Sequence, residues 1–362
     1  MAHKGDDGME NRDFLIKPDD SVLVTGSSGF IGTAVVKTLM EYGFKKIRCF
    51  VRPSSNKNRL ESILSHPGGE TMEIYEGNLL SKEDCERATD GVSVIFHLAA
   101  GRGEKSYPEA YLNSVVTTRN LLESIKQKKH LKRFLNVSSL TVYSTSNKNR
   151  GKMIDEFCDV ESRPAERGEP YCFAKVGQEQ IVYEYHKKYD LPFVMVRPGV
   201  VYGPGNRGIP GRVGIGTFGM FLHLGGANRI PLTYVDNCAE AIVLAGISNS
   251  IEGEVFNVVD DMLPTSREFL KIYKNNVKPF HSIYIPHVVS YSLCYLWEKY
   301  SDWSNGQLPP VFNRKKWRFY WDGNQYPNKK IKKLTGWRPK VGFEQAMKYY
   351  IRYQREIEGI ND

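Results

Sequence analysis

Apolar and polar positions alternate along the N-terminal half of the chain in two rhythms. Short apolar runs predict strands, and longer segments with apolar positions three and four residues apart predict helices. The predicted strands cover residues 21–25, 46–51, 72–76, 92–97, 133–137 and 192–196, and the predicted helices cover residues 29–42, 81–89, 108–127 and 171–189. Strands that alternate with helices in this way form parallel β-α-β units. We therefore predict an α/β fold built on a doubly wound parallel sheet.

The pattern changes after Pro198. Residues 199–226 are rich in glycine, which predicts a loop region near a ligand. Short apolar runs at 230–235 and 254–259 predict two further strands, with a helix at 236–247 between them. The remaining chain is rich in Tyr, Trp and Lys and contains helical stretches. The second half therefore reads as a smaller, substrate-facing region.

These changes divide the chain into three parts. We predict a disordered N-terminal extension at 1–19, a dinucleotide-binding domain at 20–200, and a substrate-binding region at 201–362. That last region is interleaved with the final strands of the sheet at about 230–260. The N-terminus is polar and charged and lacks the apolar core of a signal peptide. We therefore expect a cytoplasmic protein.

One apolar segment in the C-terminal half needs separate treatment. Residues 283–297 contain no Asp, Glu, Lys or Arg and are rich in Tyr, Val and Leu. A helix of this length is shorter than the about 20 residues needed to cross a bilayer. We favour a buried or lid helix, and a weak contact with a membrane interface stays open.

Glycines follow directly on the first predicted strand. Gly26, Gly29 and Gly32 form a G-x-x-G-x-x-G pattern at the start of the first predicted helix. Such a turn lets the backbone approach a pyrophosphate, and the helix N-terminus offers free N–H groups and positive potential. The pattern therefore predicts a Rossmann-type dinucleotide site.

Composition narrows the class of ligand. The hydrophobic fraction of 41% and the charged fraction of 25% are ordinary for a globular protein. The net charge of +9 is compatible with a solvated Lys-rich surface, a phosphate-bearing substrate or an anionic membrane surface. The sequence contains no recognition module of interleaved basic and aromatic residues, so we do not expect nucleic-acid binding. The six cysteines contain no C-x-x-C pair, which argues against a metal site and a disulfide framework.

Three residues form a candidate catalytic group. Tyr171 and Lys175 are four residues apart on a predicted helix, so they share one face. A phenol has a pKa of about 10, and a nearby cation lowers it toward a useful range for proton transfer. Ser139 ends a predicted strand, where parallel sheets place ligand-binding groups. A surface Tyr–Lys pair and a serine that only ends the strand are the alternative interpretations.

The order of these motifs closely resembles the extended short-chain dehydrogenase/reductase superfamily over roughly residues 20 to 345. That superfamily includes NAD(P)-dependent epimerases and dehydratases, 3β-hydroxysteroid dehydrogenase-like enzymes and dihydroflavonol reductase-like enzymes. The matching stretches are Thr25-Gly26-Ser27-Ser28-Gly29-Phe30-Ile31-Gly32, Gly77-Asn78-Leu79, His97-Leu98-Ala99-Ala100, Asn113, Asn120-Leu121-Leu122, Val137-Ser138-Ser139, Tyr171 with Lys175, and Arg197-Pro198-Gly199-Val200-Val201-Tyr202-Gly203-Pro204-Gly205.

The resemblance implies a role for each matching position. Ser139 would hold the substrate oxygen, Tyr171 would act as acid and base, and Lys175 would hold the nicotinamide ribose. The implied cofactor-binding residues are Gly26, Ser28, Gly29, Phe30, Ile31, Arg52, Asn78, Leu79, Leu98, Ala99, Ala100, Asn113, Val137, Tyr171, Lys175, Pro198, Val200 and Val201. Arg102, Thr141, Tyr202, Arg207, Arg212 and Arg229 are the implied substrate-binding residues. The superfamily usually has Asp at the Asn78 position, and an amide oxygen can still accept a bond from the adenine amine.

The end of the second predicted strand bears on the choice of cofactor. NAD enzymes place an acid there for the ribose 2′-hydroxyl. Here the strand is followed by Arg52, with Ser54 and Lys57 close behind and no acid. Arg52 is placed to meet a 2′-phosphate, so NADP(H) is favoured over NAD(H).

Two reactions remain open. Dehydratases of this superfamily carry an Asp-Glu pair after the fifth strand. This chain has Ser139-Leu140-Thr141 there, without the two acids, which disfavours a sugar 4,6-dehydratase. Sugar-nucleotide epimerases carry an Arg just before a final Val-Asp, and Arg229 is displaced by one position. The first hypothesis is therefore an oxidoreductase that interconverts a secondary alcohol and a ketone on a small-molecule substrate. The second is a nucleotide-sugar epimerase, and a non-enzymatic NADPH sensor is a third. The resemblance also implies a homodimer through the helices at 108–127 and 171–189.

Overall fold

The computed structural model describes residues 13–65, 72–101, 106–146, 153–304 and 312–360. Within these residues the central element is a seven-stranded sheet, in which every pair of neighbours is parallel. Its order is β11-β6-β5-β4-β1-β2-β3. The strands are β1 (Ser21–Thr25), β2 (Lys46–Val51), β3 (Glu73–Glu76), β4 (Val94–His97), β5 (Arg133–Val137), β6 (Phe193–Pro198) and β11 (Val255–Val258).

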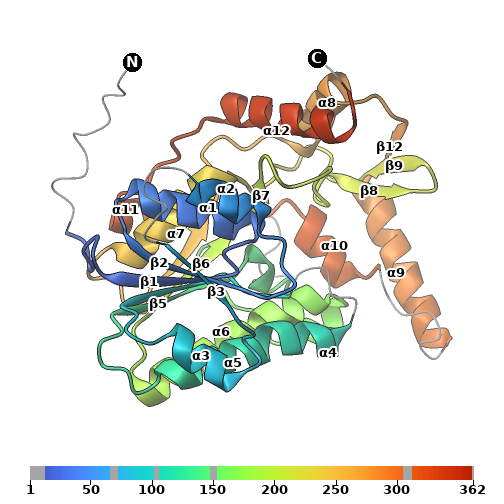
Figure 1. The fold of residues 1–362 in the computed structure, drawn as a ribbon. Coiled ribbons are helices and arrows are strands. Elements are labelled where there is room, and N and C mark those ends of the chain that lie inside the picture. The colour runs from blue at the N-terminus through green and yellow to red at the C-terminus, as the bar shows by residue number, and fades with distance from the viewer. Residues whose placement is uncertain (1–12, 66–71, 102–105, 147–152, 305–311, 361–362) are drawn as a thin grey trace.

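Helices cover both faces of this sheet, as Figure 1 shows. One face carries α1 (Phe30–Glu41), α2 (Asn58–Leu64), α7 (Val235–Ile247) and α11 (Lys329–Thr335). The other carries α3 (Lys82–Ala88), α4 (Tyr107–Ala110), α5 (Thr117–Ile125) and α6 (Pro170–Tyr189). Separate clusters of buried apolar side chains fill the two interfaces. The predicted doubly wound α/β fold is confirmed.

The predicted helix at 108–127 is not α-helical throughout. A π-helical segment, Tyr111–Val116, separates α4 from α5. Such segments occur inside helices at functional sites, because the wider turn changes which side chains face a ligand. Here the segment contains Asn113, which lines the cavity described below.

The C-terminal half builds a second layer beside the sheet. β7 (Val200–Tyr202) pairs with β10 (Leu232–Tyr234), and β9 (Met220–His223) lies between β8 (Gly214–Thr217) and β12 (Ser282–Tyr284). The helices of this half are α8 (Ser266–Asn276), α9 (His287–Trp303), α10 (Arg314–Trp321) and α12 (Phe343–Ile357). The predicted interleaving therefore differs in one respect. β11 joins the main sheet beside β6, whereas β10 belongs to the separate pair with β7.

The predicted disordered extension is wrong for residues 13–19. The Leu15 N–H donates to the Ile247 carbonyl at 2.7 Å, and Phe14 forms an isolated bridge with Ser248. Ile16 is only 3% exposed and belongs to the core beneath α7. Apolar Phe14, Leu15 and Ile16 anchor this segment, and the earlier part of the predicted extension lies outside the described residues.

The helix predicted within 283–297 is also corrected. Part of that segment is β12, and the helix itself, α9, runs from His287 to Trp303 with most of its surface exposed. It is therefore not a buried helix. Among the described residues, no helix combines the length and apolar character needed to span a bilayer.

A buried histidine joins the sheet to the helices below it. His97 Nδ1 lies 2.8 Å from Thr25 Oγ1, and its Nε2 lies 2.8 Å from Thr118 Oγ1. Burial, reinforced by the charge of Lys175, lowers the pKa of His97 to about 3. The neutral ring thus links β1, β4 and α5 at physiological pH.

This histidine predicts a pH-dependent stability. Below pH 6.5 the unfolded chain binds a proton at His97 and the folded chain does not, so the free energy of unfolding falls as pH is lowered. The contribution is about 2 kcal/mol between pH 6.5 and pH 5. In urea unfolding at several pH values, the free energy of unfolding should fall more steeply with decreasing pH for the native protein than for His97→Gln. The exposed His130 provides the control, since His130→Gln should keep the native slope. Equal slopes for the native protein and His97→Gln would contradict the prediction.

Candidate active site

The turn between β1 and α1 comes very close to neighbouring backbone. Gly26 has φ +71°, and a Cβ there would lie 3.0 Å from the Ala99 nitrogen. A Cβ on Gly32 would lie 2.0 Å from the Gly26 carbonyl oxygen. Only glycine fits at these two positions, so the turn lies directly against the backbone that follows β4, and the first turn of α1 lies against the Gly26 turn. This close packing shapes the floor of a cavity.

The cavity has a volume of about 810 Å³ and opens at the carboxyl ends of the parallel strands. All residues predicted to bind the cofactor line it, and their contact with a dinucleotide stays a prediction. Gly32 of the predicted glycine turn and Ser138 of the matching stretch Val137-Ser138-Ser139 line it as well. Its wall also contains residues that sequence reasoning missed: Phe50, Val51, Ser55, Leu80, Gly101, Thr117, Leu140, Gly199, Asn206, Pro231, Phe319 and Tyr320.

The charges on this wall are all positive. Arg52, Lys175 and Arg212 line the cavity, and none of the described lining residues is Asp or Glu. Ser138 adds a buried hydroxyl oxygen that has no partner in the described residues. Three cations, a glycine-rich turn and a helix N-terminus fit a ligand with several phosphates. The residues present therefore suit a nicotinamide dinucleotide.

The candidate catalytic group meets at the junction of α6 and β5. Tyr171 lies in the first turn of α6, is 38% exposed and faces the cavity. Lys175, one turn later, is 4% exposed, and its Nζ donates to the Val137 carbonyl at 2.7 Å. Burial lowers the pKa of Lys175 to about 8, with Glu179 acting in the opposite direction. The amine is therefore mostly a cation at neutral pH.

Ser139 is oriented by its own backbone turn. Its Oγ accepts a hydrogen bond from the Thr141 N–H at 3.2 Å and caps the short 3₁₀ turn Leu140–Val142. Because that bond uses an oxygen lone pair, the hydroxyl proton stays available for donation into the cavity. The structure thus brings Ser139, Tyr171 and Lys175 to one wall.

A buried ion pair fixes α6 against the sheet. The Arg197 guanidinium on β6 donates to both carboxylate oxygens of Glu179, at 2.8 and 2.6 Å. Both side chains are about 2% exposed. The Arg197 guanidinium also lies over the Tyr143 ring at 4.7 Å. A bidentate bond of this kind restrains rotation as well as distance, so the first turns of α6 hold a defined position.

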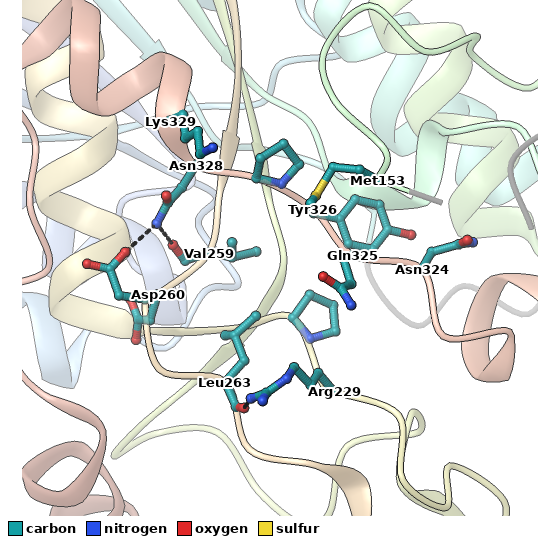
Figure 2. A pocket seen from close by; sticks show the side chains of 13 residues that line it. Met153, Arg229, Val259, Asp260, Leu263, Asn324, Gln325, Tyr326, Asn328 and Lys329 are labelled. Carbon is teal, nitrogen blue, oxygen red and sulfur yellow. Dashed lines mark hydrogen bonds between the residues drawn. The ribbon is translucent and has the colours of Figure 1, made fainter. Parts of the chain in front are cut away.

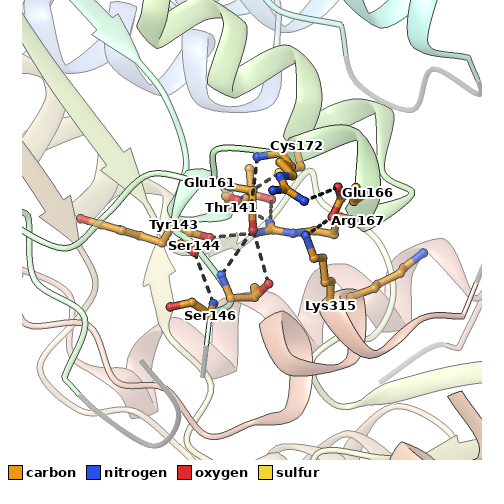
Figure 3. Close-up of polar contacts among 12 residues, drawn as sticks. Thr141, Tyr143, Ser144, Ser146, Glu161, Glu166, Arg167, Cys172 and Lys315 are labelled. Atoms are coloured by element: carbon orange, nitrogen blue, oxygen red, sulfur yellow. Dashed lines mark hydrogen bonds and ion pairs between the residues drawn. The ribbon is translucent and has the colours of Figure 1, made fainter. Parts of the chain in front are cut away.

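A second buried arginine supports the loop that carries Ser139 (Figure 3). Arg167 donates to the carbonyl oxygens of Thr141 and Tyr143, and Cys172 Sγ lies 3.4 Å from the same Thr141 carbonyl. Asn313, at the start of α10, donates to the Arg167 carbonyl at 2.8 Å. Sequence reasoning missed Arg167, because no motif distinguishes a buried arginine from a solvated one.

The C-terminal half closes one end of the cavity. Phe319 and Tyr320 of α10 line it together with Asn206 and Arg212. Arg212 is 7% exposed, donates to the Phe319 carbonyl at 2.8 Å and lies over the Phe319 ring at 4.4 Å. Because these residues belong to the half of the chain that was predicted to face the substrate, this part of the cavity is the candidate substrate end.

The other predicted substrate residues are placed differently. Thr141 lines the cavity, but Tyr202 is buried in an aromatic cluster with Tyr234 and Tyr350. Arg207 is not among the described lining residues. Arg102 lies outside the part of the chain that the structure describes.

Arg229 lies in a neighbouring pocket of about 210 Å³ (Figure 2). Its guanidinium donates to the Leu263 carbonyl at 2.8 Å. Pro231 borders both spaces. The structure therefore does not place Arg229 on the described wall of the larger cavity, and its contact with substrate stays a prediction.

On the side of the cavity predicted to hold the adenine and its ribose, some contacts differ from those expected from the sequence. Asn78 accepts a hydrogen bond from the Leu80 N–H at 3.0 Å, which engages one lone pair of the amide oxygen. Ser55, rather than Ser54, lines the cavity near Arg52. Lys57 forms an ion pair with Glu76 instead. Of the three residues predicted to bind a 2′-phosphate, Arg52, Ser54 and Lys57, only Arg52 lies on the described wall of the cavity.

Comparison with known proteins shows the family to which the chain belongs. The sequence model of the NAD dependent epimerase/dehydratase family matches residues 22–258. A dTDP-D-glucose 4,6-dehydratase of Dictyostelium discoideum is 30% identical over 212 residues, and a bifunctional dihydroflavonol 4-reductase/flavanone 4-reductase of Malus domestica is 31% identical over 195. These alignments cover 54% and 51% of this chain, and 46% and 55% of the relatives. The chain therefore spans about half the length of the curated relatives it matches.

Solved structures share the fold. A UDP-glucuronic acid 4-epimerase from Bacillus cereus, in complex with UDP-glucuronic acid and NAD, superimposes with a TM-score of 0.70 and 19% identity, covering 93% of this chain and 99% of that one. The dTDP-glucose 4,6-dehydratase DesIV from Streptomyces venezuelae, with NAD bound, gives 0.69 and 20%, covering 94% and 98%. The family match confirms the resemblance stated from the motifs, and the chain belongs to the NAD-dependent epimerase/dehydratase family of extended short-chain dehydrogenase/reductase enzymes.

Proposed function

We propose that the protein is an NAD(P)-dependent oxidoreductase that interconverts a secondary alcohol and a ketone. One observation carries the proposal. Tyr171, Lys175 and Ser139 share a single cavity with the glycine turn, and no described lining residue is a carboxylic acid. The arrangement supplies proton transfer at an oxygen atom and lacks a second acid for elimination.

Each residue has a defined task in this reaction. The Tyr171 phenol gives a proton to the carbonyl oxygen during reduction and takes it back from the alcohol during oxidation. The buried Lys175 cation stabilises the phenolate form of Tyr171. The Ser139 hydroxyl donates a hydrogen bond to the same substrate oxygen, where negative charge develops. A bound nicotinamide supplies or accepts the hydride.

The cavity wall supports NADP(H). Arg52 follows β2 at the place where an acid would bind the 2′-hydroxyl of NAD. Ser55 lies on the same wall. A guanidinium and a hydroxyl together complement a 2′-phosphate, whereas neither selects for a free ribose hydroxyl.

A nucleotide-sugar epimerase is the second candidate, and Arg212 favours it. This cation is buried at the candidate substrate end, where it complements a diphosphate. Oxidation and re-reduction at one carbon would use the same three catalytic residues. The two proposals therefore differ in the substrate that Arg212 meets and in net cofactor consumption.

Replacement of Tyr171 by Phe tests the mechanism common to both. Turnover should fall by about 10²- to 10⁴-fold, because the proton donor is removed while the ring that lines the cavity remains. The dissociation constant for NADPH, measured by protein fluorescence, should stay within about 2-fold, since one hydroxyl contributes little to a large ligand. Tyr183→Phe, on the same helix, is the matched control and should keep full activity. Retained turnover in Tyr171→Phe would contradict the mechanism.

Replacement of Arg52 by Ala tests the cofactor. The KM for NADPH should rise by about 10- to 100-fold, which corresponds to losing about 1.5 to 3 kcal/mol of charged hydrogen bonding. The KM for NADH should hardly change, because NADH has no 2′-phosphate. Lys57→Ala is the control, as Lys57 pairs with Glu76 outside the cavity wall. An equal rise in the KM values for NADPH and NADH would show that Arg52 does not recognise the 2′-phosphate.

A substrate panel distinguishes the two reactions. Purified protein with NADPH or NADH is offered UDP- and TDP-sugars, steroid-like ketones and flavonoid ketones, and nicotinamide absorbance and products are followed. The oxidoreductase consumes reduced cofactor with one ketone class. An epimerase yields a sugar isomer without net consumption, and Arg212→Gln then weakens nucleotide-sugar binding at least about 10-fold. Arg229→Gln, in the neighbouring pocket, should leave that affinity unchanged.

A further inference from the structure

Helix α9 has the reverse of the usual distribution of side chains. A surface helix of a globular protein normally buries its apolar stripe and exposes its polar face. In α9 the buried residues are the small Ser290, Cys294 and Ser301. The large apolar residues face solvent instead, and Val288, Leu296 and Trp303 are 79%, 60% and 77% exposed. Because their spacing places them opposite the buried residues, they form one continuous outer face.

We define the outer face by its large exposed members. They are Val288, Val289, Leu293, Tyr295, Leu296, Tyr300 and Trp303. Trp297 is also exposed, but it lies on the side of the helix that carries Ser290, Cys294 and Ser301. Figure 1 shows α9 extending away from the body of the protein along one side. An exposed apolar surface of this extent is unusual for a monomeric soluble protein and indicates an interaction site.

The β8–β9 hairpin extends the apolar surface beyond the helix. Phe218, at its turn, is 97% exposed, and Met220 is 43% exposed. β9 pairs with β12, the strand that leads into α9 and carries exposed Ile283 and Tyr284. In Figure 1 the hairpin and α9 extend from the same side of the protein. The three-stranded sheet thus couples both elements into one structure.

The charged residues beside this surface are mainly basic. α10 packs against α9 and contains Arg314 and Arg318, whose guanidinium groups lie near the rings of Tyr295 and Tyr291. Lys299 is exposed within α9 itself. Arg314 is compensated by its ion pair with Glu298 at 2.6 Å, and α9 also carries the exposed acid Asp302. Of these three cations, this leaves Lys299 and Arg318. The collar around the apolar face therefore complements anionic groups.

We propose that the outer face of α9, together with the β8–β9 turn, docks on the surface of a bilayer that contains anionic lipids. Interfacial helices bury Trp, Phe and Leu at the boundary of headgroups and acyl chains, and basic residues beside them meet lipid phosphates. Trp and Tyr concentrate at this depth, and both are abundant here. The helix lies on the membrane and does not cross it.

Charge argues against a second copy of the chain as the occupant. Two outer faces meeting about a two-fold axis would bring both collars into one interface, so that Lys299 and Arg318 of each copy would add to the same positive potential. Like charges facing one another oppose association. A lipid phosphate layer supplies the opposite charge at the same place.

The tryptophans provide a direct readout. Trp317, Trp321 and Trp337 are at most 4% exposed, whereas Trp303 belongs to the outer face and Trp297, on the same helix, is 37% exposed. The full chain is mixed with vesicles of phosphatidylcholine and phosphatidylglycerol at 7:3, or of phosphatidylcholine alone. Binding is followed by co-sedimentation, and insertion by quenching of tryptophan fluorescence with brominated lipids. We expect sedimentation with the mixed vesicles, at least about 10-fold weaker binding to the neutral ones, and strong quenching.

A triple variant and matched controls complete the test. Leu293→Ser, Leu296→Ser and Trp303→Ser together should weaken vesicle binding at least about 10-fold. Phe157→Ser and Met262→Ser remove exposed apolar residues elsewhere, 85% and 66% exposed, and should keep native binding. Thermal unfolding and NADPH binding verify that each variant is folded. Absence of vesicle binding or of quenching in the native protein overturns the proposal, as does equal binding by the triple variant. A native dimer that the triple variant loses, without vesicle binding, assigns the face to a second copy.

Discussion

The active-site arrangement depends on one buried hydrogen bond, from the Lys175 amine to the Val137 carbonyl. An ammonium group is costly to bury, and the structure offsets that cost with this bond and with the nearby Glu179 carboxylate. The bond joins α6 to the end of β5, where Ser139 follows two residues later. Tyr171 is placed relative to Ser139 because Lys175 is fixed relative to Val137. Removal of the amine would therefore alter geometry as well as charge.

Buried arginines extend this constraint to the rest of the molecule. Arg197 holds α6 through Glu179, and Arg167 holds the loop after β5 through two main-chain carbonyls. Arg212 connects α10, a helix of the C-terminal half, to the cavity, and Asn313 connects the start of α10 to Arg167. Main-chain acceptors carry most of these contacts. The catalytic residues consequently share one polar framework with the segment that closes the candidate substrate end.

The sequence predicted the sheet and the cofactor wall because both follow from local patterns. Apolar runs and glycine turns specify where strands end, and parallel strands bring those ends to one edge. The resemblance to the superfamily implied individual residues in the connections after those strands, such as Asn78 and Ala99, and the structure places both on the cavity wall. The π-helical segment around Asn113 left no signal, because its composition matches that of an α-helix.

Predictions failed where burial depends on distant partners. Arg229 and Tyr202 stand close to residues that line the cavity, yet one faces a neighbouring pocket and the other faces an aromatic core. Phe14 to Ile16 were missed because three apolar residues are too few to show a period. For α9 the pattern predicted a buried or lid helix, and the tertiary structure placed the small side of an exposed helix inward. Hydrophobicity alone does not say which face of such a helix meets the protein.

Helix α10 lies between α9 and the cavity. Trp317 packs on Tyr291 of α9 and donates to Ser290 Oγ at 2.9 Å, and Phe319 and Tyr320 line the cavity. Tyr320 also packs in the apolar cluster that contains Trp317 and Tyr291. One aromatic ring therefore belongs both to the wall of the candidate substrate end and to the packing against α9. The shape of that wall thus depends on a helix that is not among the described residues lining the cavity.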